Sequence, residues 1–371
     1  MLCRYKYYIL LIVHCSLLIE MTNLLDYDRL FETISELVFC HSPSGVEGEI
    51  DRVLLDRFPQ FGLETWQDEA GNVIAKIPGQ DDTRSIAITG HKDEIGAIVK
   101  TIDRDGKVRI RNLGGSFPWV YGEGVVDLLG DRGTIPGILS FGSRHVSHES
   151  QQKMLQIDAP LTWDRVWVET GLTHQELTAA GIRPGTRVVV GKHRKSPLRM
   201  GDRIASYTLD NKASVAILLA LAESIDRPFA NVYLVASAKE EVGAIGALYF
   251  TNRTHLDALI ALEIAPIAPE FPIADSVDPV LLSQDKYSIY DEGLNAEIHR
   301  AANAAGVPIQ WAAIAGFGSD ASLAIQLGHT ARGACLGFPT QNTHGYEIAH
   351  LGAIANCIRI LQAYCEPPGK G

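Results

Sequence analysis

Apolar and polar residues alternate along this chain with two different periods. Short β-branched and apolar runs, which are typical of buried strands, alternate with longer stretches that carry apolar residues at helical spacing. The strand-like runs are SIAITG, NVYLVASA, ALIALEIA and ARGACLGF, and the helical stretches include ASVAILLALAES and NAEIHRAANAAG. This alternation predicts an α/β fold with a mostly parallel sheet flanked by helices.

The pattern changes between residues 98 and 190, where short strands are separated by glycine turns. Within IVKTIDRDGKVRIRNL, the pair Asp105-Gly106 predicts a β-hairpin, because such a pair readily forms a tight turn. We therefore expect a small, mainly β domain at residues 98–190. It would be inserted into an α/β domain made of residues 21–97 and 191–371.

The first 20 residues form an apolar leader. Their stretch over residues 7–19 follows two basic residues and resembles the central part of a signal peptide. It is shorter than the ~20 apolar residues that a membrane helix needs. His14 interrupts it, and no small-residue cleavage site follows. We interpret residues 1–20 as an upstream extension or a misassigned start, with export as the alternative, and expect the soluble domain to begin near Met21.

The composition and charge of the chain exclude some classes of function. The 371 residues are 46% hydrophobic, which is enough for a large core and two domains. The net charge of -11 argues against a nucleic-acid partner, because phosphate binding needs clustered Lys and Arg, and the 33 basic residues form no long run. The 6 cysteines are widely spaced without a CxxC pair, so we expect reduced thiols, a cytoplasmic location and no membrane partner.

Metal-binding side chains follow the predicted strands. Ligands of open α/β sheets gather at the carboxyl ends of the strands. We therefore expect these side chains to meet at one edge of the sheet, where a hydrolytic metal centre could be assembled. They are His91 and Asp93 after SIAITG, Asp210 where YTL meets a helix, Glu240 and Glu241 after NVYLVASA, Glu263 at the close of ALIALE, and His344 in the loop after ARGACLGF.

Most of these residues also have an ordinary structural role open to them. Asp210 ahead of an apolar helix could be an N-cap. The adjacent Glu240 and Glu241 could be the solvated first turn of the helix GAIGALYF, favoured by its dipole. Glu263 differs, because a carboxylate that closes an apolar run is expected to be partly buried. A buried charge is costly unless it is paired or bound to metal.

Several motifs, in order from about residue 21 to the C-terminus, resemble the glutamyl aminopeptidase family, which includes the tetrahedral TET aminopeptidases. They are PSGVEGE at 43–49, GHKDEIG at 90–96, LDNKAS at 209–214, KEEVGAIGA at 239–247, then GFGSDA and PTQNTHGYE. The resemblance implies two divalent metal ions per subunit, zinc or alternatively cobalt. One ion would be held by His91 and Glu263 and the other by Glu241 and His344, with Asp210 bridging both.

The resemblance also implies a metal-dependent aminopeptidase that acts on peptides. Glu240 would be the general base for a bridging water, and Asp93 would support His91 from outside the metal's ligand shell. The inserted β domain would be a PDZ-like dimerisation domain of a homo-oligomer, from a dimer up to a dodecamer. The chain departs from the family pattern with Glu263 in place of the usual Asp, Lys239 in place of Gln, and QNTHGYE in place of RYIHSxxE.

Three alternatives stay open at this point. The same metal centre could deacylate N-acylated amino acids. A glycosidase could use paired carboxylates as acid and base, but it would leave His91 and His344 without a role. A non-catalytic metal-binding assembly module would not need a general base, whereas Glu240 is present.

Overall fold

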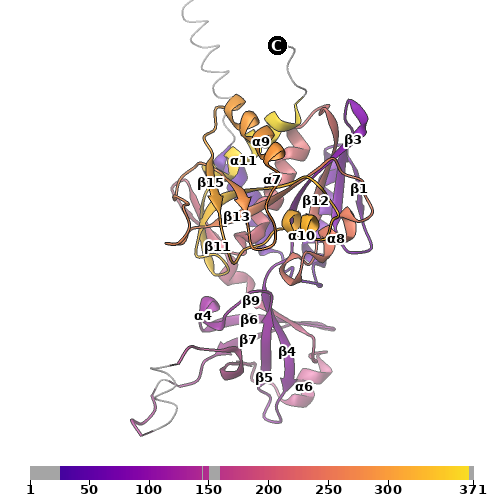
Figure 1. The fold of residues 1–371 in the computed structure, drawn as a ribbon. Helices are drawn as coiled ribbons and strands as arrows, with labels where there is room; N and C mark the ends of the chain where they lie inside the picture. The colour runs from indigo at the N-terminus through magenta and orange to yellow at the C-terminus, as the bar shows by residue number, and fades with distance from the viewer. Residues whose placement is uncertain (1–25, 144, 150–158, 367–371) are drawn as a thin grey trace, which may run out of the picture.

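The computed structural model describes residues 26–143, 145–149 and 159–366, so the apolar leader lies outside the described residues. The chain forms an α/β domain with a small β-barrel below it (Figure 1). The predicted combination of an α/β fold with a smaller β body is therefore confirmed. No helix of the described ranges is both long and apolar enough to cross a membrane.

The α/β domain is built on an 11-stranded sheet. Its main path runs β1 (Glu64–Gln67), β2 (Val73–Ile77), β12 (Ala230–Ser237), β3 (Asp81–His91), β13 (Ala258–Pro266), β16 (Gly333–Gln341), β17 (Tyr346–His350), β11 (Arg203–Tyr207) and β10 (Leu198–Met200). Off this path, β14 (Val280–Gln284) pairs with β15 (Gln310–Ala313) and β16.

The prediction of a mostly parallel sheet is wrong outside the centre. Strands β12, β3, β13 and β16 pair in parallel, as do β14 and β15, but the other pairs of described strands are antiparallel. The outer pairs β1–β2, β10–β11 and β16–β17 are joined by short connections, which can link only antiparallel neighbours. The four central strands need long crossovers, and these carry the helices.

Helices cover both faces of the sheet. On one face, α7 (Leu209–Ser224) is buried nearly all round and packs with α2 (Tyr27–Phe39), α3 (Gly48–Gln60) and α11 (Leu351–Cys365), and α9 (Glu292–Ala304) packs against α11. On the other face lie α8 (Ile245–Thr251) and α10 (Asp320–Gln326). Alternate strand residues serve the two cores: Ile86 and Ile88 belong to the first, and Ala87 to the second.

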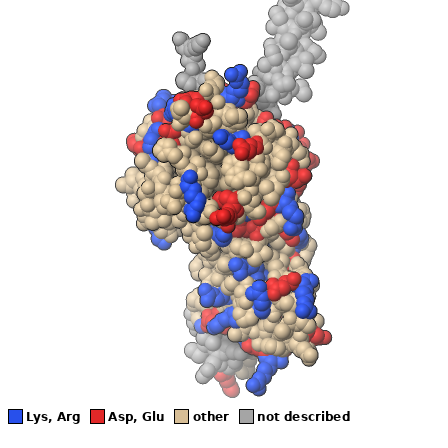
Figure 2. Space-filling view, turned by 90° about the vertical axis from the view of Figure 1, so that its right-hand side faces the viewer, with Lys and Arg blue, Asp and Glu red and all other residues tan. Residues whose placement is uncertain are grey.

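The barrel closes through β4 (Gly96–Ile102), β5 (Val108–Leu113), β8 (Trp167–Glu169), β7 (Gly133–Ser140), β6 (Gly124–Gly130) and β9 (Arg187–Val190). Two short helices, α4 (Pro118–Tyr121) and α6 (His174–Ala179), accompany it. The predicted hairpin at Asp105-Gly106 is confirmed, because β4 and β5 pair across it and Gly106 has φ +86°. On the face shown in Figure 2, basic and acidic residues are interspersed over both the α/β domain and the barrel.

Candidate metal centre

The predicted site residues come from segments far apart in the sequence and meet at one edge of the sheet. His91 is the last residue of β3, and His344 lies in the turn between β16 and β17 with φ +64°. Glu263 lies inside β13, which continues to Pro266, so the strand is longer than the run ALIALE suggested. The carboxyl ends of the parallel strands therefore deliver imidazoles and carboxylates to a common point.

The ordinary structural roles do not describe Asp210 or the glutamate pair. Asp210 follows the first residue of α7 with a non-helical ψ of 104°, and its carboxylate faces histidines. Glu240 and Glu241 occupy a separate 3-10 turn (Glu240–Val242), and the helix α8 begins only at Ile245. Their side chains are 13% and 6% exposed, so the pair is not a solvated helical turn.

Asp210 lies between the two histidines. Its Oδ1 is 3.0 Å from His91 Nε2, and its Oδ2 is 3.5 Å from His344 Nε2. Around it, ligand atoms within 4.8 Å of one another form a first cluster of His91, Asp210 and Glu263 and a second cluster of Asp210, Glu241 and His344. One carboxylate therefore belongs to both clusters, one oxygen toward each histidine.

Backbone carbonyls hold both imidazoles. His91 Nδ1 lies 3.0 Å from the carbonyl oxygen of Asp93, and His344 Nδ1 lies 3.0 Å from that of Gly115. A carbonyl can only accept, so each Nδ1 carries the hydrogen. The lone pair of each Nε2 can then be offered to a cation among the carboxylates, as in metal sites whose histidines are oriented by an outer partner.

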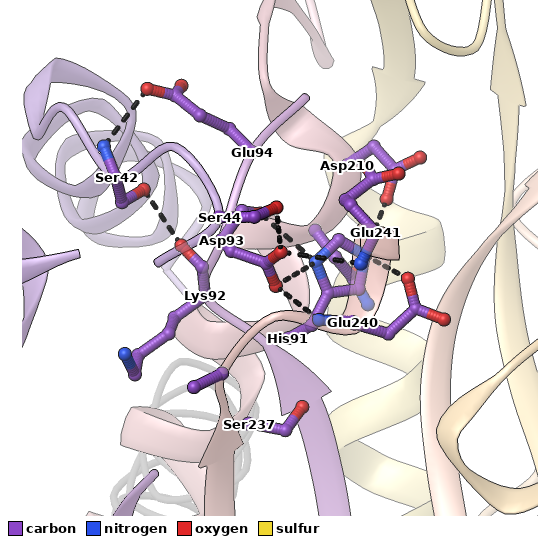
Figure 3. Close-up of polar contacts among 12 residues, drawn as sticks. Ser42, Ser44, His91, Lys92, Asp93, Glu94, Asp210, Ser237, Glu240 and Glu241 are labelled. Carbon is purple, nitrogen blue, oxygen red and sulfur yellow. Dashed lines mark hydrogen bonds and ion pairs between the residues drawn. The ribbon is translucent and has the colours of Figure 1, made fainter. Parts of the chain in front are cut away.

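Asp93 organises the glutamate pair (Figure 3). Its Oδ1 accepts a hydrogen bond from the Glu240 backbone N–H at 2.9 Å, and its Oδ2 accepts from the Glu241 N–H at 3.3 Å and from Ser44 Oγ at 2.6 Å. Glu240 Oε2 lies 3.9 Å from His91 Nε2, yet Glu240 belongs to neither cluster. Glu241 therefore belongs to the second cluster, whereas Glu240 lies beside the first cluster without belonging to it.

The electrostatics of the site fit divalent cations. Burial and repulsion by neighbouring carboxylates raise the pKa values of Glu240, Glu241 and Glu263 well above the usual range. Oε1 of Glu241 is buried without a hydrogen-bond partner among the described residues. Imidazole and carboxylate donors are the set that zinc and similar cations take, and cations here would relieve both the repulsion and the orphaned oxygen.

The surroundings of His91 and Asp210 shift their pKa values in opposite directions. Burial alone would lower the pKa of His91, but hydrogen bonds to Asp210 and Asp93 and the charges of Glu263 and Glu240 raise it well above its usual range. Burial alone would raise the pKa of Asp210, but the hydrogen bond and charge of His91 hold it below its usual range. The carboxylates that favour a proton on His91 Nε2 would equally favour a cation in place of that proton.

Sequence reasoning missed supporting residues that lie inside the quoted motifs. Glu347 accepts hydrogen bonds from the backbone N–H groups of Asp210 (2.9 Å) and His344 (3.1 Å), and burial and the charge of Asp210 raise its pKa to about 8. Asn211 donates to Glu263 Oε2 at 3.1 Å. Asp320 accepts from Ser237 Oγ at 2.6 Å, and burial raises its pKa to about 6.

The chain is similar to curated aminopeptidases over most of its length. It is 25% identical over 355 residues to the putative aminopeptidase YhfE of Bacillus subtilis, a match covering 92% of this chain and 98% of that protein. It is 29% identical over 240 residues to the putative aminopeptidase SgcX of Escherichia coli, covering 63% of this chain and 62% of that protein.

Solved structures share the fold. An aminopeptidase from the archaeon Desulfurococcus kamchatkensis superposes with a TM-score of 0.82 at 24% identity, covering 92% of this chain and 95% of that one. The TET1 peptidase of Pyrococcus horikoshii, which can assemble into a tetrahedron or a large octahedral shell, superposes with a TM-score of 0.81 at 22% identity, covering 91% and 100%.

A model of a known protein family matches most of this chain. The model of the M42 glutamyl aminopeptidases matches residues 71–360, which include both clusters, Glu240 and the whole barrel. This confirms the resemblance that the ordered motifs indicated. The chain belongs to the M42 glutamyl aminopeptidase family and is a hydrolase of the aminopeptidase type.

Proposed function

We propose that this chain is a metal-dependent aminopeptidase that removes N-terminal residues from peptides at a dinuclear centre. The observation that carries the proposal is the position of Asp210, whose two carboxylate oxygens face two histidines and which belongs to both clusters. A carboxylate that belongs to two ligand clusters can bridge two neighbouring cations.

The residues of the two clusters would hold the cations. His91 and Glu263 would bind one, Glu241 and His344 would bind the other, and Asp210 would bridge them. Two bound divalent cations would polarise the scissile carbonyl group and lower the pKa of the attacking water. The donor set suits zinc, and cobalt accepts the same ligands.

Glu240 would act as the general base. It belongs to neither cluster but stands beside the first, so its carboxylate is free to take a proton from the attacking water and to deliver that proton to the leaving amine. Burial and the charges of Glu241, Asp320 and Asp93 raise its pKa, a perturbation typical of groups that exchange protons at an active site. Asp93 would position it through the backbone N–H of Glu240.

The histidines favour this reaction over glycoside hydrolysis. Both imidazoles face Asp210, which gives them a function in cation binding, whereas two carboxylates alone would suffice for a glycosidase. Deacylation of N-acylated amino acids would use the same residues. An aminopeptidase differs from a deacylase in needing a free substrate amino group, so blocked and free substrates separate the two activities.

The barrel would serve assembly. Its closed sheet lies to one side of the α/β domain (Figure 1), and the TET1 peptidase, with the same fold, forms large shells. We propose that residues 98–190 act as a PDZ-like dimerisation domain of a homo-oligomer.

The test is a panel of aminoacyl p-nitroanilides, each with a free and an N-acetylated amino group. Protein freed of metal by a chelator and then supplied with zinc, cobalt or manganese is assayed on the panel. The proposal expects activity on free substrates alone, lost on chelation and restored by metal. Full activity of the metal-free protein would exclude the dinuclear mechanism. Release of acetate from the acetylated substrates, measured separately, without release of p-nitroaniline from the free ones would assign the chain to the deacylases.

A further inference from the structure

A segment of the barrel lies against the second cluster. Gly114 and Gly115, here called the glycine seat, follow β5 on the way to α4. The carbonyl oxygen of Gly115 accepts the hydrogen bond from His344 Nδ1 at 3.0 Å. A Cβ added at Gly115 would stand 2.9 Å from His344 Cε1, and one at Gly114 would stand 3.3 Å from Glu241 Cβ. Both residues that belong to the second cluster alone therefore rest on the seat.

The first cluster is supported differently. His91 is held by the carbonyl oxygen of Asp93, and Glu263 accepts a hydrogen bond from Asn211 Nδ2 at 3.1 Å. Asp93 and Asn211 both belong to the α/β domain, one just after β3 and the other in α7. The two clusters share Asp210. The α/β domain also supports the second cluster, through Asp93 at the Glu241 N–H and Glu347 at the His344 N–H, but only the second cluster has a further support from the barrel.

His344 is the cluster residue that most needs outside support. Its side chain is 38% exposed, whereas that of His91 is 2% exposed. It also lies in a turn with a left-handed backbone, not in a strand. Packing therefore restricts its ring less than that of His91. The hydrogen bond to Gly115 fixes both the ring orientation and the hydrogen on Nδ1, and so directs Nε2 toward Asp210 and Glu241.

The seat is tied to the barrel. Asn112 Nδ2 donates to the carbonyl oxygen of Gly114 at 3.0 Å, and Ser116 Oγ donates to that of Gly96 at 2.9 Å. Trp163 Nε1 donates to the carbonyl oxygen of Ser116 at 2.9 Å. Asn112 is in β5, Gly96 begins β4, and Trp163 lies in the 3-10 turn before β8. A shift of these barrel elements would carry the seat with it.

We infer that the inserted barrel is a structural part of the second cation site: the glycine seat positions His344 and Glu241, so cation binding at the second cluster depends on the seat, while binding at the first does not. This rests on the proposed dinuclear centre. Gly115 is a positioning residue, because it acts on the cation only through His344. The absence of a side chain is required there, since a methyl group would force the imidazole away from its place.

The experiment titrates metal-free protein with Zn²⁺ by calorimetry and with Co²⁺ by its visible absorption, for wild type and Gly115→Ala. We expect two cations per wild-type chain. The variant should keep one at wild-type affinity and bind the other roughly 10- to 100-fold more weakly, the usual effect of losing an outer support. Gly171→Ala is the matched control, because it strains a barrel loop with φ +72° but places its methyl group where no atom lies within 4 Å.

A second variant tests the same support if Gly115→Ala does not fold. Trp163→Phe removes the indole N–H that holds Ser116 and should weaken the same single cation to a smaller extent. Thermal melting of each metal-free variant shows whether it is folded. Wild-type binding of both cations by folded Gly115→Ala and by Trp163→Phe, or equal weakening of both cations, would overturn the role of the seat and leave the proposed function standing. A wild-type protein that binds a single cation would contradict the dinuclear centre itself.

Discussion

Replacing Glu94 by glutamine should destabilise the protein far more than removing any surface ion pair. The Glu94 side chain is 1% exposed and accepts hydrogen bonds from Lys195 Nζ at 2.7 and 2.6 Å and from Lys212 Nζ at 3.0 Å. Its Oε1 also accepts from the Ser42 N–H at 3.0 Å, as Figure 3 shows. Lys195 in turn lies 3.2 Å from His41 Nδ1, whose ring reaches Asp127 of the barrel at 3.0 Å.

The pKa values give the size of the effect. Burial would raise the pKa of Glu94, but the charges of Lys195, Lys212 and His41 lower it from 4.5 to about 2. At about 1.4 kcal/mol per pKa unit, this is a stabilisation of roughly 3 kcal/mol at neutral pH. Burial lowers the pKa of Lys195 from 10.5 to about 8, an opposing cost of similar size. The intact pair of Glu94 and Lys195 therefore adds little net free energy to the stability of the fold, as is common for buried ion pairs.

Glu94→Gln removes one partner only. Two buried ammonium groups then lose their counter-charge, which costs about 3–5 kcal/mol. The folded-state pKa of Glu94 lies below 4.5, so its stabilisation is fully present above that pH and is lost as the pH falls toward about 2. The difference in free energy of unfolding between wild type and Glu94→Gln should therefore shrink below about pH 4.5.

Urea unfolding of both metal-free proteins, followed by tryptophan fluorescence from neutral pH down to about pH 3, measures this difference. Asp131→Asn is the control, because it breaks the exposed pair with Arg183 and should leave the free energy of unfolding close to wild type. A Glu94→Gln protein as stable as wild type at neutral pH, or a difference that stays constant down to about pH 3, would refute the reasoning.

Two further predictions concern the site and the assembly. Asp93→Asn replaces one acceptor oxygen by an amide group, so the N–H of Glu240 or Glu241 loses its partner at a cost of about 1–3 kcal/mol, and turnover should fall roughly 10- to 100-fold. Ser44→Ala, which removes a single donor to Asp93, should have a smaller effect, and wild-type turnover of Asp93→Asn would contradict this role. Light scattering should give a mass above the 40.5 kDa of one chain at micromolar concentration, and a monomer would count against the assembly.

Much of the site could be predicted from local sequence. His91 and Glu241 follow apolar runs that read as buried strands, and parallel strands bring their carboxyl ends together whatever the details of packing. The contacts that support these residues could not be predicted in this way, because they join positions far apart in the sequence. Glu347 meets Asp210 across 137 residues, and Gly115 meets His344 across 229, and neither partner has a local pattern that indicates the other.

The direction of the outer strands was missed for a related reason. Alternation of strand and helix predicts parallel pairing only where a helix lies between consecutive strands. β1 and β2 are separated by five residues and β10 and β11 by two, so no crossover fits there. The short connections were visible in the sequence, but the strands of β10 and β11 are three and five residues long and carry no clear alternation.

The central claim assigns different chemistry to two adjacent glutamates. Glu240→Gln keeps the size of the side chain but removes the proton acceptor, while Glu241→Gln replaces an anionic ligand of the second cluster by a weak neutral one. Elemental analysis of both variants beside their turnover on an aminoacyl p-nitroanilide tests this directly. We predict that Glu240→Gln retains wild-type metal with turnover lower by roughly 10² or more, and that Glu241→Gln loses one cation together with activity. Equal metal content and equal activity in the two variants would contradict the account.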